Sequence, residues 1–279
     1  MLATFANGRV EAWLDGARPL EPRELADAAT SRAVATLLRG FHAARVAPVA
    51  APSLWPTIFA WLAKCRGVRL ADEARRAVFD AISLEGLAEE AARCKALCDA
   101  TDSPTVYCHN DLLSANLLTN GGDAAGASSP SLRIIDFEYS CYNPRGFDIG
   151  NHFNEWAGFE CEYERFPTEA AQRSFLAAYL DASTELTGAA DGAGDGGGAV
   201  SAEATMRRLL AEAAAFSLAS HLYWGVWALL QAQFSAIDFD YLAYHGLRMA
   251  EFRRRFADVE EIVERGTAAV LSTTPSRSR

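Results

Sequence analysis

The chain has 279 residues, of which 50% are hydrophobic and 10% aromatic, so it is expected to fold around a sizeable core rather than to stay disordered. Its formal net charge is −10, and because nucleic-acid binding needs clustered positive charge, no nucleic-acid partner is expected. A negative protein does suit a small cationic substrate through its long-range field.

The chain begins with a predicted β-hairpin. Leu2–Phe5 and Val10–Leu14 have strand-like composition and are joined through Asn7-Gly8, a dipeptide typical of tight hairpin turns. Asp15–Glu21 is predicted as a connector, and Pro22 suits the first turn of a helix. Helical patterns follow over 28–46, from Trp55-Pro56 onward, over 71–82 and over 84–99.

Two strand-like segments, Thr105–Cys108 and Leu132–Ile135, flank the most informative part of the chain. The first runs into Cys108–Asn116, with the sequence CHNDLLSAN, and the second into Asp136-Phe137-Glu138-Tyr139. Between them, Asn120–Ser131 is rich in Gly, Ala and Ser and is predicted as a variable hairpin tip.

The remainder is predicted to be mostly helical. Helices are expected over Ile149–Gly158, from Thr168 to about Leu186, over Ser201–Phe234 and over Asp240–Phe256. Gly188–Ala199 is expected to be a glycine-rich linker, and Thr267–Arg279 a disordered tail.

Ala213–Ile237 contains no Asp, Glu, Lys or Arg, which by length alone would allow a membrane span. Polar residues interrupt this run, and Ser217, Ser220 and His221 share one helical face with Trp224. Such a mixture suits the lining of a site better than contact with lipid, so no stable membrane span is expected.

The six cysteines contain no C-x2-C pair, which makes a zinc site improbable. Reduced thiols are the expected state, and Met1–Phe5 lacks the basic flank and the length of a signal peptide. The chain is therefore expected to be cytoplasmic.

Asp111, Asn116 and Asp136 form the polar set that phosphoryl transfer needs. One carboxylate orients the attacking hydroxyl, while an amide oxygen and a second carboxylate hold Mg²⁺ on the nucleotide phosphates. Taken singly, each Asp has a structural alternative, a turn for Asp111 and a strand-end cap for Asp136. The ordered set favours the catalytic interpretation.

The motifs resemble those of the choline/ethanolamine kinase family. The similarity continues through Ile135–Phe153, through Phe216–Trp227 and into Ile237–Tyr241, and it covers roughly residues 1–256. It implies an α+β, protein-kinase-like fold with a mostly helical C-lobe and a truncated N-lobe hairpin. It also supports Asp111 as the hydroxyl-orienting base and Asn116 and Asp136 as Mg²⁺ ligands. Asp148 is expected to be structural, and Glu138 either lies near the metal or forms a salt bridge.

One part of the family pattern is missing. Family chains begin with a lobe of strands that carries a phosphate-covering loop and a strand lysine, whereas Met1–Leu14 resembles only the last two strands. Lys64 and Lys95, the two lysines of the chain, lie in helical stretches. The expected organisation is a remnant of the N-lobe and hinge over 1–15, a C-lobe over 16–266 and the tail over 267–279. Ala12, Trp13 and Leu14 are expected to touch adenine.

The resemblance also implies a pocket for the cationic end of the substrate, because aromatic faces attract ammonium groups. Its candidate residues are Tyr139, Glu155, Trp224, Trp227, Phe239 and Tyr244, with Phe159 as a further aromatic. For any one of these rings the alternative is ordinary core packing.

The predicted function is an ATP- and Mg²⁺-dependent ethanolamine kinase that makes phosphoethanolamine for phosphatidylethanolamine synthesis. Leu112-Leu113 and Asn154 resemble the ethanolamine branch of the family more than the choline branch. Three alternatives are open: a choline kinase, a relative of the aminoglycoside phosphotransferases, which the Trp-rich motif disfavours, and a non-catalytic lobe that binds an amino alcohol or a partner protein. A homodimer is also left open.

Overall fold

The computed structural model describes residues 2–10, 12–120, 131–180 and 202–271. The α-helices are α1 (Ala28–His42), α2 (Leu54–Cys65), α3 (Glu73–Asp80), α4 (Leu84–Asp99), α5 (Arg145–Asn154), α6 (Glu169–Leu180), α7 (Ala202–Phe234) and α8 (Tyr241–Leu271). The strands are β1 (Ala3–Phe5), β2 (Gly8–Val10), β3 (Ala17–Pro19), β4 (Thr105–Cys108), β5 (Leu117–Asn120), β6 (Leu132–Ile134) and β7 (Cys141–Pro144). This is the mostly helical α+β architecture that the sequence predicts.

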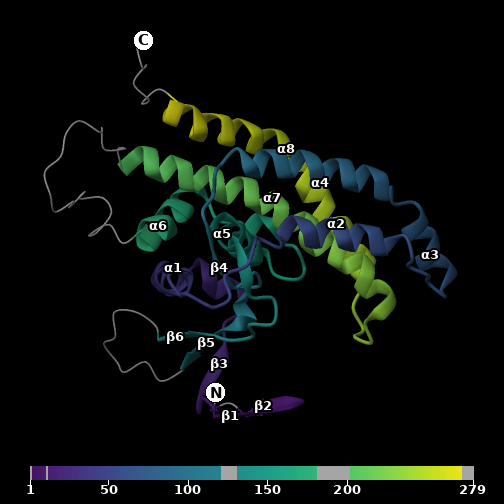
Figure 1. Cartoon of the computed structure of the whole chain (residues 1–279), viewed down its shortest axis with the longest axis horizontal. Coiled ribbons are helices and arrows are strands. Elements are labelled where there is room, and N and C mark those ends of the chain that lie inside the picture. Colours follow the sequence, from purple (N-terminus) through teal and green to yellow (C-terminus); the bar gives the residue numbers. More distant parts are fainter. Residues whose placement is uncertain (1, 11, 121–130, 181–201, 272–279) are drawn as a thin grey trace, which may run out of the picture.

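The helices form the body of the molecule around α7 and α8, which pack along each other (Figure 1). Helices α2 and α4 pack on α7 from one side, while α1 and α6 pack together elsewhere on the body. By length and composition α7 could cross a membrane, but 89% of its most apolar window is buried inside the protein. Its apolar character is therefore explained by a central position in the core.

Close contact between α5 and α7 depends on glycine. A Cβ atom on Gly150 would lie 2.5 Å from the backbone nitrogen of Ser217 and 2.6 Å from the carbonyl oxygen of Ala213. Any side chain at this position would force the two backbones apart, since real Cβ atoms do not approach so closely.

Within the described residues, the strands form three small sheets rather than one. Strand β4 pairs with β7, with Cys108 opposite Cys141, and β5 lies between β3 and β6. The prediction of strands at Thr105–Cys108 and Leu132–Ile135 is confirmed, apart from one residue at the end of the second. The prediction of Asp15–Glu21 as a connector is wrong, because Ala17–Pro19 forms β3, and β5 and β7 were not foreseen.

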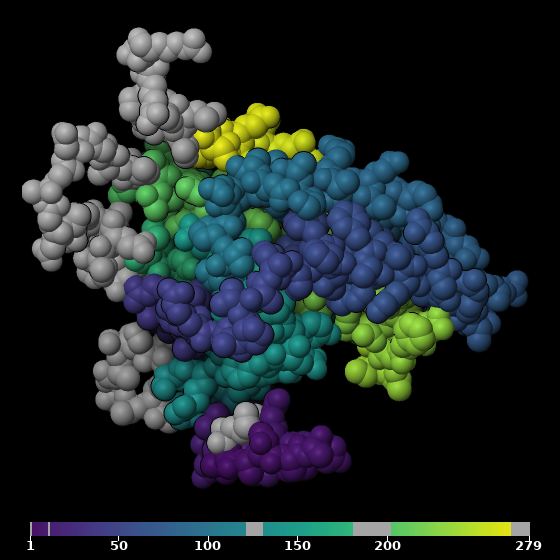
Figure 2. Space-filling view, in the orientation of Figure 1, coloured from purple at the N-terminus to yellow at the C-terminus, as the bar shows by residue number. Residues whose placement is uncertain are grey.

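An N-terminal hairpin is present, but its second strand and its turn differ from the prediction. Strand β2 covers Gly8–Val10 rather than Val10–Leu14, and because Phe5 pairs with Gly8, the two-residue turn is Ala6-Asn7. It protrudes from the body as the purple segment at the bottom of Figure 2. Large apolar side chains on it and beside it are exposed, and Trp13 is 88% exposed.

The helix boundaries differ from the predictions mainly at their ends. Helix α1 ends at His42 rather than at Val46, and the predicted helix over Ile149–Gly158 begins earlier, at Arg145, and closes with a 3-10 turn over Glu155–Ala157. Helix α8 continues to Leu271, beyond the expected start of the tail at Thr267. The predicted hairpin tip, the glycine-rich linker and the rest of the tail lie wholly or largely outside the described residues.

Candidate active site

The segment after β4 is anchored by Asp148, which is fully buried in α5. Its two carboxylate oxygens accept hydrogen bonds from the backbone N–H groups of His109, at 2.7 Å, and Asn110, at 2.6 Å. The Nε2 atom of His42 donates to the same carboxylate at 2.9 Å. Burial raises the pKa of Asp148, but hydrogen bonds and charge interactions with His42 and His109 together outweigh this and keep the pKa below the usual range. Asp148 is therefore structural, as the sequence predicts.

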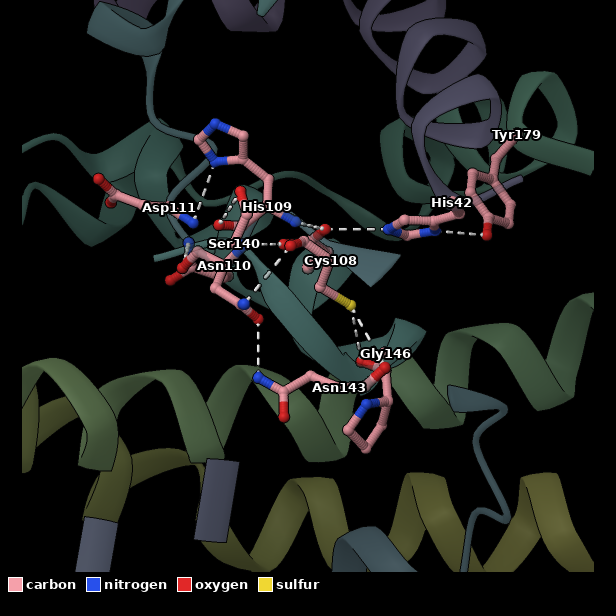
Figure 3. A network of polar contacts seen from close by, with 12 residues as sticks. His42, Cys108, His109, Asn110, Asp111, Ser140, Asn143, Gly146 and Tyr179 are labelled. Carbon is pink, nitrogen blue, oxygen red and sulfur yellow. Dashed lines mark hydrogen bonds and ion pairs between the residues drawn. The ribbon is translucent and has the colours of Figure 1, made fainter. Parts of the chain in front are cut away.

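A second set of bonds ties this loop to the segment that carries Asp136. The Nε2 atom of His109 bonds the carbonyl oxygen of Ile135 at 2.9 Å, and the Nδ2 atom of Asn110 donates to the carbonyl oxygen of Tyr139 at 2.8 Å. Asn143 on β7 donates to Oδ1 of Asn110 at 2.9 Å. Figure 3 shows the bond between Asn110 and Asn143, with His42 and Tyr179 on one side of Cys108 and Asp111 on the other. The two halves of the predicted motif are thus held together by hydrogen bonds.

Asp111 and Asn116 meet at the end of this loop. The Nδ2 atom of Asn116 donates to the backbone oxygen of Asp111 at 2.8 Å and to its Oδ2 atom at 3.1 Å. Burial raises the pKa of Asp111 to about 8, and the negative charge of Glu155 adds to the rise. A cation bound nearby would lower this pKa again, because positive charge favours the carboxylate.

Asp136 follows β6 and adopts a left-handed backbone conformation, with φ of 63°. The backbone N–H of Ile135 donates to the carbonyl oxygen of Asn116 at 3.0 Å. This bond brings the backbone next to Asp136 close to Asn116, so the two predicted metal ligands lie on adjacent segments. The donor set fits a hard divalent cation, since the pairing of Asn116 uses its amide nitrogen and leaves its amide oxygen for coordination. Asn116 and Asp136 would hold such a cation.

The predicted aromatic residues form one cluster of edge-to-face rings. Trp224 packs on Tyr139, with ring centroids 5.2 Å apart, and on Trp227, at 5.5 Å. Phe239 packs on Tyr244 at 5.6 Å, and Tyr241, which the sequence analysis did not select, connects Trp227 to Phe239 at 5.6 and 5.0 Å. Phe159 adjoins Phe239 at 6.1 Å. The structure therefore brings together rings from four separate segments.

Glu155 lies 7% exposed at the end of α5. Its Oε1 atom forms an ion pair with Nη1 of Arg248 on α8 at 3.2 Å. Its partner was missed because Arg248 lies far along the chain, although an arginine four residues after Tyr244 on an apolar helix face was an available signal.

His221, which shares a predicted helix face with Trp224, is fully buried against Tyr163, with ring centroids 5.4 Å apart. Leu112, part of the pair that resembles the ethanolamine branch, is fully buried in the hydrophobic core. Ala12, Trp13 and Leu14 lie between β2 and β3, where Ala12 and Trp13 are exposed, and their role in adenine binding stays a prediction.

This combination of residues occurs in a known family. A model described as choline/ethanolamine kinase matches residues 1–253 of the chain. The chain belongs to the choline/ethanolamine kinase family. It is 35% identical over 257 residues to a probable ethanolamine kinase of Arabidopsis thaliana, covering 91% of this chain and 63% of that protein. Human ethanolamine kinase 1 is 34% identical over 261 residues, covering 90% of this chain and 53% of that protein.

The fold of this family member is similar to that of a solved relative. An ethanolamine kinase of Plasmodium vivax superposes with a TM-score of 0.75 at 28% identity, covering 92% of this chain and 69% of that one. The chain thus spans about three-fifths of the length of the curated relatives it matches.

Proposed function

We propose that the protein transfers the γ-phosphoryl group of ATP to the hydroxyl of ethanolamine, with Mg²⁺, and so makes phosphoethanolamine for phospholipid synthesis. The observation that carries this proposal is the arrangement of two unlike ends in one site. A half-buried carboxylate, Asp111, lies at one end, and an aromatic cluster with Glu155 lies at the other.

The hydroxyl end is suited to orienting an alcohol. Asp111 lies on a loop whose backbone is fixed by Asp148, so its carboxylate can accept the hydrogen bond of a primary hydroxyl in a defined direction. When bound, Mg²⁺ would supply positive charge to the phosphate oxygens, with Asn116 and Asp136 as its protein ligands.

The ammonium end is suited to a small organic cation. Ring faces of Tyr139, Trp224 and Trp227 attract cations by about 0.5–2 kcal/mol each, depending on desolvation. The Glu155 carboxylate and the Tyr244 hydroxyl are acceptors for the N–H donors of a primary ammonium, which choline lacks. The names of the Arabidopsis and human relatives also favour ethanolamine.

Choline is the second candidate, because a rat relative described as a choline/ethanolamine kinase is also 34% identical over 259 residues. Aromatic rings with one nearby carboxylate would be sufficient for a quaternary ammonium.

The test measures ADP formation and the phosphomonoester product with ATP, Mg²⁺ and either ethanolamine or choline, and measures binding of both by calorimetry. The expected result is a higher kcat/KM for ethanolamine than for choline, with loss of turnover in Asp111→Asn. A higher kcat/KM for choline would overturn the ethanolamine assignment. Binding without turnover would support the non-catalytic alternative. The absence of both binding and turnover would overturn the proposal.

A further inference from the structure

Arg248 is 1% exposed, and its guanidinium group contacts three different structural elements. Its Nη1 atom bonds Oε1 of Glu155 at 3.2 Å and donates to the hydroxyl of Tyr244 at 3.1 Å. Its Nη2 atom donates to Oγ of Ser220 at 2.7 Å. The fixed fork of a guanidinium can reach these acceptors at once, whereas a lysine ammonium has one nitrogen.

From Ser220 the hydrogen bonds continue toward the catalytic loop. Its Oγ donates to Oδ1 of Asn151 on α5 at 2.8 Å, and Nε1 of Trp224 donates to the same oxygen at 2.8 Å. The Nδ2 atom of Asn151 is 3.4 Å from the carbonyl oxygen of Asn110, the residue before Asp111. All donors in this series point the same way, from Arg248 through Ser220 and Asn151 to the loop, and bonds aligned in this way strengthen one another.

We propose that Arg248 is a positioning residue that ties the ammonium end of the site to the hydroxyl end, through Ser220 and Asn151. This inference rests on the proposed function. The ammonium and the hydroxyl of one small substrate lie a fixed distance apart. The ammonium pocket must therefore be held in a fixed position relative to Asp111. Arg248 holds Glu155 and Tyr244 on one side, and its hydrogen-bond series holds the Trp224 ring and the Asn110 peptide on the other.

Charge compensation of Glu155 is the simpler alternative role for Arg248, and it makes a different prediction. If Arg248 acts only as a counter-ion, breaking the series beyond Arg248 has no effect on the reaction. If it positions the loop, such a break lowers kcat while the ammonium pocket, which keeps its ion pair, still binds substrate.

Ser220→Ala is the decisive variant, because it removes the link while it retains the ion pair. Thr101→Ala is its control, since Thr101 is also buried and its hydroxyl donates to the carbonyl of Cys98 on α4, outside the site. Asn151→Asp breaks the series at a second point, because its carboxylate still accepts from Ser220 but lacks the amide donor to Asn110.

Steady-state kinetics of these variants with ATP and ethanolamine, with calorimetric ethanolamine binding and melting temperatures, test the inference. Ser220→Ala and Asn151→Asp are expected to lower kcat about tenfold and to change ethanolamine affinity less than threefold, while Thr101→Ala stays within twofold of wild type. Arg248→Lys, which keeps the charge, is expected to reproduce the loss of kcat.

If the wild type is active and Ser220→Ala and Asn151→Asp match Thr101→Ala in kcat, the inference is overturned and the proposed function stands. If kcat falls only in variants whose melting temperature falls in parallel, the role is structural and the inference is likewise overturned. If the wild type neither binds nor phosphorylates an amino alcohol, the proposed function itself fails, and the inference fails with it.

Discussion

At the hydroxyl end of the site, the carboxylate of Asp148 accepts hydrogen bonds from two backbone N–H groups and from His42. At the ammonium end, by contrast, the rings of Tyr139, Trp224 and Trp227 pack edge to face. The first end depends on a few buried polar contacts, and the loss of any one leaves unpaired groups. The second end distributes its contacts over many rings, each of which contributes a little. The two ends should therefore respond differently to substitution, with abrupt losses at the first and graded losses at the second.

The largest effect is expected from Asp148→Ala. This change leaves the N–H groups of His109 and Asn110 buried without their acceptor, so the free energy of unfolding should fall by about 3–5 kcal/mol in denaturant titrations. The control is Asp80→Ala, at an exposed position near the end of α3, with an expected change within about 0.5 kcal/mol. Similar stabilities for the two variants would show that the hydroxyl end is not held by Asp148.

Asp136→Ala tests the metal-binding part of the same end. Loss of this carboxylate should lower kcat roughly 100-fold or more, because the phosphates would lose charge stabilisation from the cation. The measurement is kcat as a function of Mg²⁺ concentration, with Glu138→Ala as a neighbouring exposed carboxylate for comparison. Turnover of Asp136→Ala within tenfold of wild type would exclude the assigned role.

His152 allows the loop to be probed by pH. Its Nδ1 atom lies 3.0 Å from the carbonyl oxygen of Leu112, and burial lowers its pKa to about 4. In the unfolded chain the pKa is about 6.5, so between these values the unfolded state binds the proton and the folded state does not. The free energy of unfolding should therefore fall as the pH drops from about 6.5 to 4, by on the order of 2 kcal/mol.

Equilibrium unfolding of wild type and His152→Gln at several pH values measures this contribution. The variant should show a shallower decline in stability over this range, and identical pH slopes would show that His152 does not titrate on unfolding.

The smallest effect is expected at the ammonium end. Trp224→Ala should raise the KM for the amino alcohol about tenfold and change the KM for ATP less than threefold, because the ring should contact only the ammonium. Trp55→Ala, which also removes a buried indole but in α2, should lower stability without this selectivity. Equal changes in both KM values would mean that Trp224 is only part of the core.

Local patterns were sufficient to predict the helical architecture and the loop motif. The spacing of Asp111 and Asn116 and the apolar run of α7 are properties of contiguous residues, and both were found. Strands β3 and β5 were missed because each has only three or four residues and is stabilised by pairing with a distant segment.

The same limit applies within the site. The partnership of Glu155 with Arg248 and the role of Asn151 depend on the packing of α5, α7 and α8, which no local pattern shows. Trp224 and Trp227 could be selected from sequence because they are consecutive members of one helix face, whereas Tyr241 reaches them only after the chain reverses between α7 and α8.

The close approach at Gly150 has a consequence for substrate length. This glycine lies beside Asn151 on the helix that supports the Asp111 loop, and it contacts the backbone of the helix that carries Trp224. Because Gly150 has no Cβ atom, the backbones of the two helices meet at this point, which limits how closely the two ends of the site can approach each other. Ethanolamine and choline both place two carbons between nitrogen and oxygen. This contact would therefore select substrates by the number of carbons in the chain, and it would not distinguish them by the number of methyl groups on nitrogen.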